Sequence, residues 1–514
     1  MKLRIQFVCF LVFLLIAQLS GRVSSAQDTP LQGFDDYVNK ALADWRIPGL
    51  AIAIVKDDKV VFAKGYGVRR LGDPMPVNER TMFAIGSPTK AFTATALAML
   101  VDEGKIKWDD PVTKHLKDFQ LYDPYVTREI TVRDLLCHRS GLDRGDELWN
   151  GSTLDRDEIL RRFRYQKPAW GFRSHFGYNN IMYLAAGQII SAVTGKTWDA
   201  FVKERIFTPL GMTSTGTTLT ALKNFENVAN PHTRTPEEVR SIPWRNSDNA
   251  GPFGSIYSDV VDMAQWLRLQ LGEGSYQDQK LVSIGSVDEM QQPQMIIPLE
   301  GAALSAPQAH FLSYGFGWFL QDYHGVKVVR HGGNINGMVS MVGMLPEEKL
   351  GVVILSNMDT NELPTALLFR VFDSYLGLPS QDWSTRILTI LRIGEARQKA
   401  EAKRAEEARV KNTKPTLALA QYIGTYRNDM YGEARVTEAP QANGQVKLLL
   451  HYSDSYRGEM EHWHYDTFHL KWEGPGMGDT FVTFTLNAQG QIDAMKVQKF
   501  DEFKRVPEGA SAVE

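Results

Sequence analysis

The distribution of strand-forming residues constrains the fold of this chain more than any other feature of the sequence. Between residues 32 and 378, β-rich runs stand at both ends and helical patterns fill the middle. The runs are 50–55 and 60–67 near the start, then 326–330, 338–345 and 351–356 near the end. We therefore predict an α+β fold, in which one antiparallel sheet is built from both ends, is flanked by helices and is joined by a helical subdomain.

A change of composition after Pro379 predicts a second domain. Residues 395–414 are rich in Ala with interleaved Glu, Lys and Arg, as in an exposed helical linker. Strand-like runs then recur, with an Asn443-Gly444 hairpin dipeptide, at 445–452, 463–472, 481–486 and 492–500. We predict a first domain over 27–380, a charged helical linker over 381–414 and an all-β domain of barrel or sandwich type over 415–514.

The first 26 residues have the pattern of a secretory signal peptide. Lys2 and Arg4 precede an apolar run over 7–17, and a polar stretch with small residues ends at Ala26. The alternative is an uncleaved anchor helix, but the run is shorter than the roughly 20 residues that a bilayer requires. We therefore expect cleavage near Ala26, no integral membrane span in the mature protein, and a periplasmic or secreted location.

The composition excludes several classes of protein. Hydrophobic residues make up 43% of the chain, charged residues make up 23%, and the formal net charge is −3, which is ordinary for a soluble globular protein. No basic stripe occurs, which argues against a nucleic-acid partner. Cys9 lies in the signal region, so Cys137 has no partner for an internal disulfide and is expected to be a packed core thiol.

A serine and a lysine three residues apart are the first sign of catalytic chemistry. The tetrapeptide Ser87-Pro88-Thr89-Lys90 opens a segment, 87–103, that is apolar on nearly all sides and predicts a buried helix. Residues three apart share one helix face, so Lys90 can reach the hydroxyl of Ser87. Burial disfavours the ammonium form, which makes Lys90 a candidate base for the Ser87 nucleophile. A motif this short also occurs by chance, so its context decides.

A second motif, Tyr178-Asn179-Asn180, supplies part of that context. The phenol of Tyr178 can relay a proton between Ser87 and a leaving group. Asn180 can form hydrogen bonds with Lys90 and with a substrate amide. Residues 426–428 repeat the pattern Tyr-x-Asn, but they lie beyond the linker in the predicted β domain and are rejected.

A third motif, His331-Gly332-Gly333, completes the predicted site. Its two glycines leave a strand edge bare, so that the backbone of a ligand can approach closely. The amides of Ser87 and Asn334 can then form an oxyanion hole for a tetrahedral intermediate. The prediction includes no metal and no cofactor. It names as catalytic or substrate-binding residues Ser87, Lys90, Tyr178, Asn180, His331, Gly332, Gly333 and Asn334.

The order and spacing of these motifs resemble the serine β-lactamase-like family. That family includes class C β-lactamases, D-alanyl-D-alanine carboxypeptidases, D-aminopeptidases and related esterases. Supporting segments at 135–142, 209–213, 314–318 and 344–357 are similar as well, so the resemblance covers residues 32–378. The C-terminal region, with Tyr422-Ile423-Gly424-Thr425-Tyr426, is similar to the lipocalin-like domains appended to some members.

The resemblance implies an exported serine hydrolase with Ser87 as nucleophile, Lys90 and Tyr178 as the acid/base pair, and Asn180 and His331 as substrate-side groups. The implied substrates are amides or esters of small molecules or short peptides, such as peptides with D-residues. The alternatives are a slow-turnover penicillin-binding or cell-wall-binding protein and a true β-lactamase. True β-lactamases usually carry Lys where His331 stands, and a neutral imidazole holds a carboxylate less firmly than an ammonium. The oligomeric state is left open.

Several other residues have ordinary structural interpretations. On a strand, His462, His464 and Asp466 share one face and imitate part of a zinc motif, but solvated polar residues are the favoured interpretation. His138 precedes Ser140-Gly141 and is interpreted as a turn-stabilising residue. The aromatic residues of the β domain are expected in its core, although a lipocalin-like cavity can also hold a ligand.

Overall fold

The computed structural model describes residues 30–507 except 236–237, 301–306, 336, 441–445, 475–477 and 499. The predicted signal peptide and the predicted Asn443-Gly444 turn lie outside the described residues. Within the described ranges, no helix combines the length and the apolar character needed to cross a bilayer.

The two ends of the first domain meet in one eight-stranded sheet with the order β2-β1-β14-β13-β12-β11-β10-β9. β1 and β14 are antiparallel neighbours, with Leu50 opposite Ser356 and Lys56 opposite Leu350. The predicted α+β fold is therefore confirmed. The strands are β1 (Gly49–Lys56), β2 (Lys59–Gly67), β9 (Met295–Ile296), β10 (Leu312–Tyr314), β11 (Phe319–Tyr323), β12 (Val326–Ile335), β13 (Met338–Leu345) and β14 (Leu350–Ser356).

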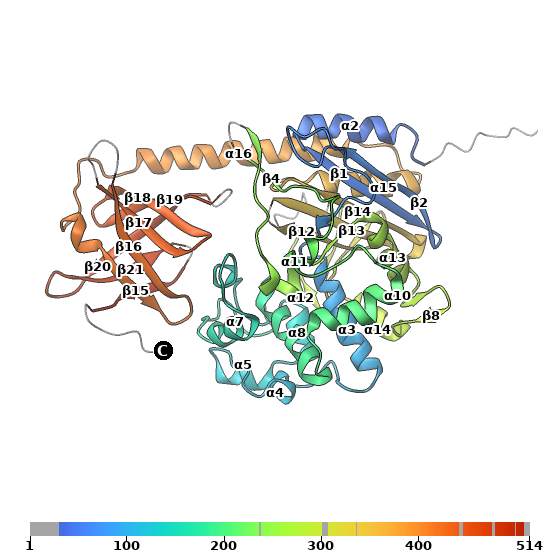
Figure 1. Ribbon diagram of the computed structural model, residues 1–514, viewed down its shortest axis with the longest axis horizontal. Coiled ribbons are helices and arrows are strands. Elements are labelled where there is room, and N and C mark those ends of the chain that lie inside the picture. Colours follow the sequence, from blue (N-terminus) through green and yellow to red (C-terminus); the bar gives the residue numbers. More distant parts are fainter. Residues whose placement is uncertain are drawn as a thin grey trace, which may run out of the picture.

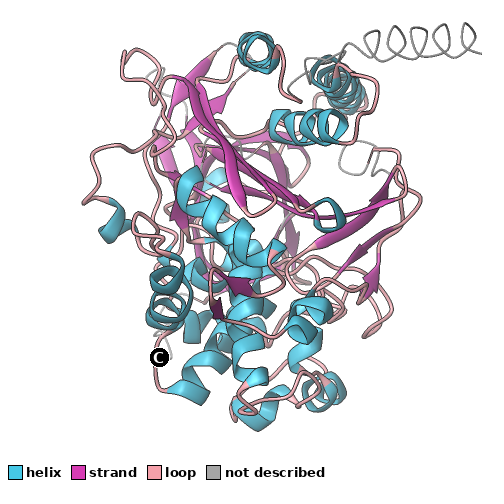
Figure 2. Ribbon diagram, turned by 90° about the vertical axis from the view of Figure 1, so that its right-hand side faces the viewer, coloured by secondary structure: helices cyan, strands magenta, loops and turns pink. Residues whose placement is uncertain are grey.

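Both faces of this sheet are covered by helices, because alternate residues of its strands point to opposite sides. In β1, Leu50, Ile52 and Ile54 pack in one cluster with α2 (Phe34–Trp45), α15 (Leu363–Tyr375) and the start of α16. The intervening Ala51, Ala53 and Val55 pack on the other side, with α13 (Val260–Leu271) and the helical region. Figures 1 and 2 show the sheet lying between these two helical layers.

The helical region is centred on α3 (Thr89–Asp102) and α8 (Asn180–Thr194), with the short α12 (Gly251–Gly254) beside both. Nearly every side chain of α3 is buried, as its apolar pattern indicates. The helix begins two residues later than the predicted segment, and Ser87 and Pro88 form a turn at its mouth. The remaining helices are α4 (Val112–His115), α5 (Pro124–Glu129), α6 (Val132–Leu136), α7 (Arg156–Phe163), α9 (Trp198–Val202), α10 (Thr208–Leu210), α11 (Leu219–Leu222) and α14 (Ile284–Met290).

A long helix, α16 (Trp383–Glu407), leads to a closed C-terminal barrel (Figure 1). This helix covers most of the segment 381–414 that was predicted as a charged helical linker, and its residues Trp383, Ile387 and Leu388 pack onto the first domain. The barrel strands are β15 (Gly424–Asn428), β16 (Gly432–Pro440), β17 (Val446–Ser453), β18 (Tyr456–His464), β19 (Thr467–Trp472), β20 (Thr480–Leu486), β21 (Ile492–Val497) and β22 (Glu502–Arg505).

One predicted strand of the barrel is wrong. The run 463–472 is divided between the end of β18 and the whole of β19, because Tyr465 adopts a left-handed conformation with φ 48° and reverses the chain. The side chain of Asp466 accepts hydrogen bonds from the backbone and hydroxyl of Thr416, which fixes this turn. Alternating apolar residues cannot reveal such a reversal when no Gly or Pro marks it.

Side chains fill the interior of the barrel. Pairing of β15 with β22 closes the sheet, with Tyr426 opposite Arg505. Inward-facing residues pack in one cluster, which includes Leu448, Leu450, Met460, Phe468, Leu470, Val482 and Phe484. The barrel also contacts the first domain: Lys167 forms an ion pair with Asp501 at 3.5 Å.

Candidate active site

Ser87 and Lys90 lie together at the mouth of α3. The Nζ of Lys90 is 3.2 Å from the Oγ of Ser87, and it also donates a hydrogen bond to the carbonyl oxygen of Phe253 at 3.2 Å. Lys90 is fully buried, and this desolvation, with a smaller contribution from the charge of Arg144, holds the pKa of its amine well below the usual value. A neutral amine beside a serine hydroxyl can accept the proton of that hydroxyl.

Tyr178, which lies two residues before the start of α8, contacts the same hydroxyl. Its phenol donates a hydrogen bond to the Oγ of Ser87 at 2.9 Å, and the Nζ of Lys90 lies 4.8 Å from the centre of its ring. Burial raises the pKa of Tyr178 above its usual value, so the phenol is neutral at physiological pH. Asn179 holds the tyrosine at the start of α8, because its side chain accepts a hydrogen bond from the backbone N–H of Met182.

His138 supports Tyr178 from behind. Its ring centre is 4.2 Å from that of Tyr178, and its Nδ1 accepts a hydrogen bond from the backbone N–H of Asn179 at 3.0 Å. Burial and the nearby Lys90 lower the pKa of His138 well below its usual value. This histidine therefore acts as a neutral packing partner of the tyrosine, in addition to its place in a turn with φ 60°.

Asn180 does not make the predicted hydrogen bond with Lys90. Its Nδ2 instead donates to the Oδ1 of Asp146 at 2.8 Å, while its buried Oδ1 has no hydrogen-bond partner among the residues that the structure describes. The sequence could not reveal this partner of Asn180, because Asp146 comes from a separate loop whose position depends on the fold. Asp146 in turn forms an ion pair of 2.7 Å with Arg144.

Three groups at the site were missed by the sequence analysis. The guanidinium of Arg144 lies 5.1 Å from the ring centre of Tyr178, and Asp146 holds it there. Both residues lie within four positions of the end of the segment 135–142, and this closeness is the signal that could have pointed to them. The third group is the carbonyl of Phe253, and a backbone acceptor leaves no trace in the identity of a residue.

The strand β12 presents an open edge beside the nucleophile. β11 pairs with β12 only as far as Arg330, so that the segment after it extends beyond its neighbour. A Cβ atom on Gly333 would lie 2.1 Å from the carbonyl oxygen of Ile85, so glycine is needed for close packing against the Ser87 turn. A Cβ atom on Gly86 would lie 3.3 Å from the amide nitrogen of Asn334, which sets the predicted oxyanion-hole segments side by side.

The ring of His331 is held by hydrogen bonds to two neighbours. His331 is buried, and both of its ring nitrogens are engaged within the protein. Its Nδ1–H donates to the carbonyl oxygen of Gly332 at 2.7 Å, so its Nε2 accepts from the hydroxyl of Tyr314 at 2.9 Å. Burial lowers the pKa of His331 to about 3, so the ring is neutral. The residue therefore braces β12, and its contact with substrate stays a prediction.

The remaining candidates show no catalytic arrangement among the described residues. Cys137 is buried, which raises the pKa of its thiol to about 12 and makes it a poor nucleophile. In the barrel, a bulge separates His462 from His464, and the side chain of Asp466 is held by Thr416 and Tyr422. Over the described part of the chain, no group of three or more His, Cys, Asp or Glu side chains is arranged to hold a metal ion.

Known family models match both parts of the chain. The β-lactamase family model matches residues 34–372. A second model, of a domain of unknown function (DUF3471), matches residues 408–508, which include the barrel. Two curated proteins illustrate the relationship. An unguisins hydrolase of Aspergillus violaceofuscus is 29% identical over 80% of this chain and 77% of its own length. Protein flp of Staphylococcus aureus is 27% identical over 65% of this chain and 64% of its own length.

Solved structures share the fold over most of the chain. An octameric penicillin-binding protein homologue from Pyrococcus abyssi covers 93% of this chain and 100% of its own, with a TM-score of 0.62 and 22% identity. SurE covers 94% of this chain and 100% of its own, with a TM-score of 0.55 and 18% identity. At these identities the likeness concerns the fold.

Proposed function

The chain belongs to the β-lactamase family of serine hydrolases, and from this premise we propose that it is an exported enzyme that acylates Ser87 while it hydrolyses amides or esters, such as those of peptides with D-residues. One observation carries the proposal: the hydroxyl of Ser87 is within hydrogen-bonding distance of both the buried amine of Lys90 and the buried phenol of Tyr178. A lysine exposed to solvent is protonated at neutral pH and cannot accept a proton. Burial lowers the pKa of its amine, so that a desolvated lysine can act as a base.

The proposed reaction proceeds in two halves. The Oγ of Ser87 attacks the carbonyl carbon as its proton passes to the Nζ of Lys90, and the amides of Ser87 and Asn334 stabilise the oxyanion. The bond to the leaving group then breaks, and the proton reaches that group through the phenol of Tyr178. Water enters, cleaves the new ester with the same base, and restores the serine. The unpartnered Oδ1 of Asn180 is suited to accept a hydrogen bond from a substrate N–H.

Efficient penicillin hydrolysis is not part of the proposal. The position where β-lactamases usually carry a lysine holds His331, whose ring is neutral and bonded to Tyr314 and Gly332. A penicillin carboxylate would find no cation there. We therefore expect simple esters and peptides to be turned over faster than β-lactams.

The decisive experiment compares the wild-type protein with Ser87→Ala on p-nitrophenyl esters. We expect turnover to fall by about 10³-fold or more in the variant, with an unchanged circular dichroism spectrum. Ser275→Ala, which changes an exposed serine on β7 (Ser275–Tyr276), is the matched control and should retain full activity. Intact-mass spectrometry should detect the acyl group on the wild-type chain alone. Ester turnover by Ser87→Ala at the wild-type rate would reject the proposal.

Intact mass also separates turnover from slow penicillin binding. A stable adduct with a fluorescent penicillin, together with no ester or peptide product, would instead favour the slow-turnover alternative. Export is tested separately by N-terminal sequencing of the processed protein, which should begin at or near Gln27. A mature chain that keeps Met1 would contradict the signal peptide.

A further inference from the structure

The proposed reaction requires the buried phenol of Tyr178 to give up a proton. Burial raises the pKa of this phenol, because a phenolate in the core would lose its hydration. A basic leaving group, such as an amine or an alkoxide, needs that proton as its bond to the acyl carbon breaks, whereas a nitrophenolate can leave without it. A positive charge beside Tyr178 would therefore favour substrates of the first kind.

Three groups that could carry such a charge lie against Tyr178. The ring centres of His138 and His331 are 4.2 and 6.3 Å from that of Tyr178, and the Nζ of Lys90 is 4.8 Å from it. Burial lowers the pKa of all three groups, which disfavours a positive charge on any of them. In the resting site, the phenol therefore gains little electrostatic help from these neighbours.

Arg144 brings a permanent charge to the same ring, because a guanidinium is not deprotonated in proteins. Its central carbon lies over the ring of Tyr178, 5.1 Å from the ring centre. After burial and the hydrogen bond with Ser87, this charge is the next influence on the pKa of the phenol, which it lowers more than the nearby Asp146 raises it. The attraction between the cation and the ring grows as the phenol releases its proton, because the ring then becomes negative.

Hydrogen bonds to the catalytic motif hold Arg144 in this place. Its Nε donates to the Oδ2 of Asp146 at 2.7 Å, and the Oδ1 of Asp146 accepts from the Nδ2 of Asn180 at 2.8 Å. The carbonyl oxygen of Asp143 accepts from the Nδ2 of Asn179 at 2.5 Å. The loop that carries Arg144 is thus tied to the two asparagines that directly follow Tyr178.

The charge of Arg144 is only partly shielded from water. Its side chain is 55% exposed and borders a cavity of about 1040 Å³ that is lined from both domains. Solvent screens part of such a charge. We therefore expect its effect on the reaction to be smaller than the 10²-fold or more, roughly, that a buried oxyanion donor contributes.

We propose that Arg144 is a positioning residue of the proposed hydrolase: held by Asp146 over the ring of Tyr178, it makes the phenol a better proton donor to the leaving group. As the bond to the acyl carbon breaks, the proton of the phenol passes to the leaving atom. The phenol then recovers a proton from the amine of Lys90, which took it from Ser87. Besides burial, the charge of Arg144 also disfavours the ammonium form of Lys90, so both transfers are assisted.

The inference rests on the proposed function and narrows its substrate class. Amides and esters of simple alcohols have basic leaving groups, so their cleavage depends on the acid. Activated esters depend on it much less. Arg144 therefore extends the activity of the enzyme toward amides and alkyl esters.

The test compares leaving groups on one acyl group. The kcat/KM of the full-length protein is measured with the 4-nitrophenyl, phenyl and trifluoroethyl esters of N-acetyl-D-alanine, in order of increasing basicity of the leaving group. We expect Arg144→Gln to lower kcat/KM by about tenfold for the trifluoroethyl ester and by less than about twofold for the nitrophenyl ester. Arg144→Lys, which keeps the charge, should recover most of this loss.

A second variant shows whether Arg144 acts through the phenol. Tyr178→Phe removes the acid, so adding Arg144→Gln to it should lower the remaining kcat/KM for the trifluoroethyl ester by less than about twofold. The inference is overturned if Arg144→Gln slows all three esters equally, or if its full effect persists beside Tyr178→Phe. Neither result bears on the nucleophile, which the comparison with Ser87→Ala decides.

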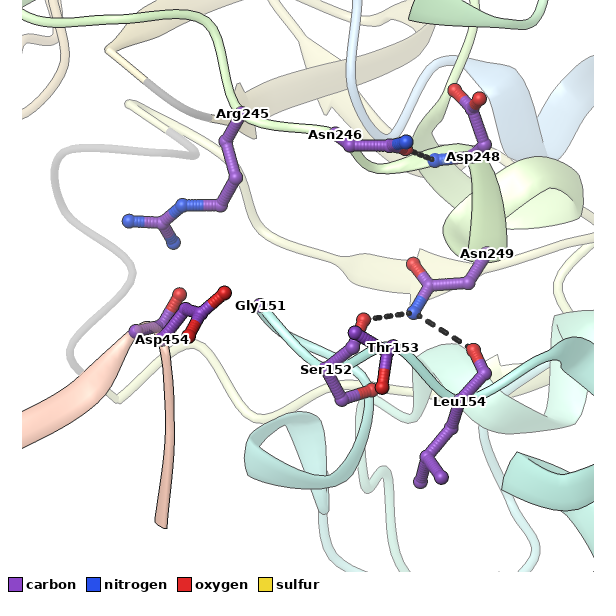
Figure 3. Close-up of a pocket in the computed structure, with 10 residues that line it drawn as sticks. Gly151, Ser152, Thr153, Leu154, Arg245, Asn246, Asp248, Asn249 and Asp454 are labelled. Atoms are coloured by element: carbon purple, nitrogen blue, oxygen red, sulfur yellow. Dashed lines mark hydrogen bonds between the residues drawn. The ribbon is translucent and has the colours of Figure 1, made fainter. Parts of the chain in front are cut away.

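Arg245 provides the matched control, because it is an arginine on another loop of the same domain. Its Nη1 donates to the side-chain oxygen of Asn150 at 2.9 Å. Its guanidinium extends into a different cavity, of about 540 Å³, between the two domains (Figure 3). Arg245→Gln removes the same charge as Arg144→Gln and should leave the ratio of the three rates unchanged. An equal change of this ratio in both variants would reduce the effect of Arg144 to one of net charge and overturn the inference.

Discussion

The catalytic domain and the barrel both bury tyrosines, but they use them differently. In the catalytic domain, the hydroxyl of Tyr178 bonds to Ser87, which lies far away in the sequence. In the barrel, the hydroxyl of Tyr426 donates to the carbonyl of Tyr422 four residues earlier, at 2.7 Å. The hydroxyl of Tyr426 is thus satisfied locally, whereas the catalytic domain brings a lysine and a tyrosine from separate elements to one hydroxyl.

This difference indicates that the catalytic domain loses stability to its function, whereas the barrel does not. A desolvated amine such as Lys90 destabilises the fold, and such a group persists when function requires it. The packed aromatic and aliphatic interior of the barrel carries no comparable cost. Four experiments can sharpen or break this contrast.

The largest effect is expected from Lys90→Met. Removal of the base should lower kcat/KM for p-nitrophenyl esters by about 10³-fold, while the midpoint of thermal unfolding is maintained or raised, because an apolar chain of similar length replaces a desolvated amine. Calorimetry and ester assays on the same preparation measure both. A variant that loses activity together with several degrees of stability would contradict the trade-off.

The pH dependence of that stability difference gives a second readout. The unfolded chain keeps Lys90 protonated up to its ordinary pKa, whereas the folded chain releases the proton at a lower pH. Between those two pKa values, the unfolded state binds more protons, so wild-type stability rises with pH. The advantage of Lys90→Met should therefore shrink as the pH increases from 7 toward 10.

In the barrel, Phe468→Ala should cost about 3–5 kcal/mol of stability, because it removes a buried ring from a hydrophobic cluster and leaves a cavity there. Phe468 is 1% exposed and packs edge-on against Tyr422 and Phe484. Urea unfolding measures the loss, and Phe311→Ala, at a site 76% exposed, is the control. The ester activity of the folded fraction should not change, and a proportional loss of chemistry would show that the two domains are not independent in function.

We expect His331 to make a contribution of intermediate size to the pH dependence of the free energy of unfolding. Its pKa is about 3 in the folded protein, below the usual 6.5, so below pH 6.5 the unfolded state gains a proton that the folded state does not. This group therefore removes stability as the pH falls from 6.5 toward 3, at up to about 1.4 kcal/mol per pH unit. Urea unfolding of His331→Gln should show a shallower decline than the wild type, whereas the exposed-site variant His451→Gln should follow it.

The smallest effect tests the contact between the domains. Gly151 and Gly195 both have φ +70°, but a Cβ atom on Gly195 meets nothing within 4 Å, whereas one on Gly151 meets Ser455. Each alanine variant should lose about 1–2 kcal/mol from backbone strain. Only Gly151→Ala should also increase hydrogen exchange in the β17–β18 turn. Equal exchange in the two variants would show that the turn does not depend on this contact.

Much of the fold could be predicted from local sequence patterns. The helices α2 and α15 follow directly from apolar periodicity. The β1–β2 hairpin follows from its turn, in which Asp57 and Asp58 adopt positive φ values of 50° and 60°. The contact between Ser87 and Lys90, which are three residues apart, likewise depends on a single turn of the backbone. All of these features are set by neighbours in the chain.

The sequence by itself determined most of the strands and helices, with the reversal at Tyr465 as an exception, and which residue types are available for chemistry. Only the tertiary structure decided which partners those residues take: Asn180 contacts Asp146, His331 bonds to Tyr314, and the barrel turn reaches Gly151. The physical reason is that local spacing fixes backbone geometry, whereas a long-range hydrogen bond depends on how distant segments pack. Desolvation, which sets the state of Lys90, is likewise a property of the assembled core.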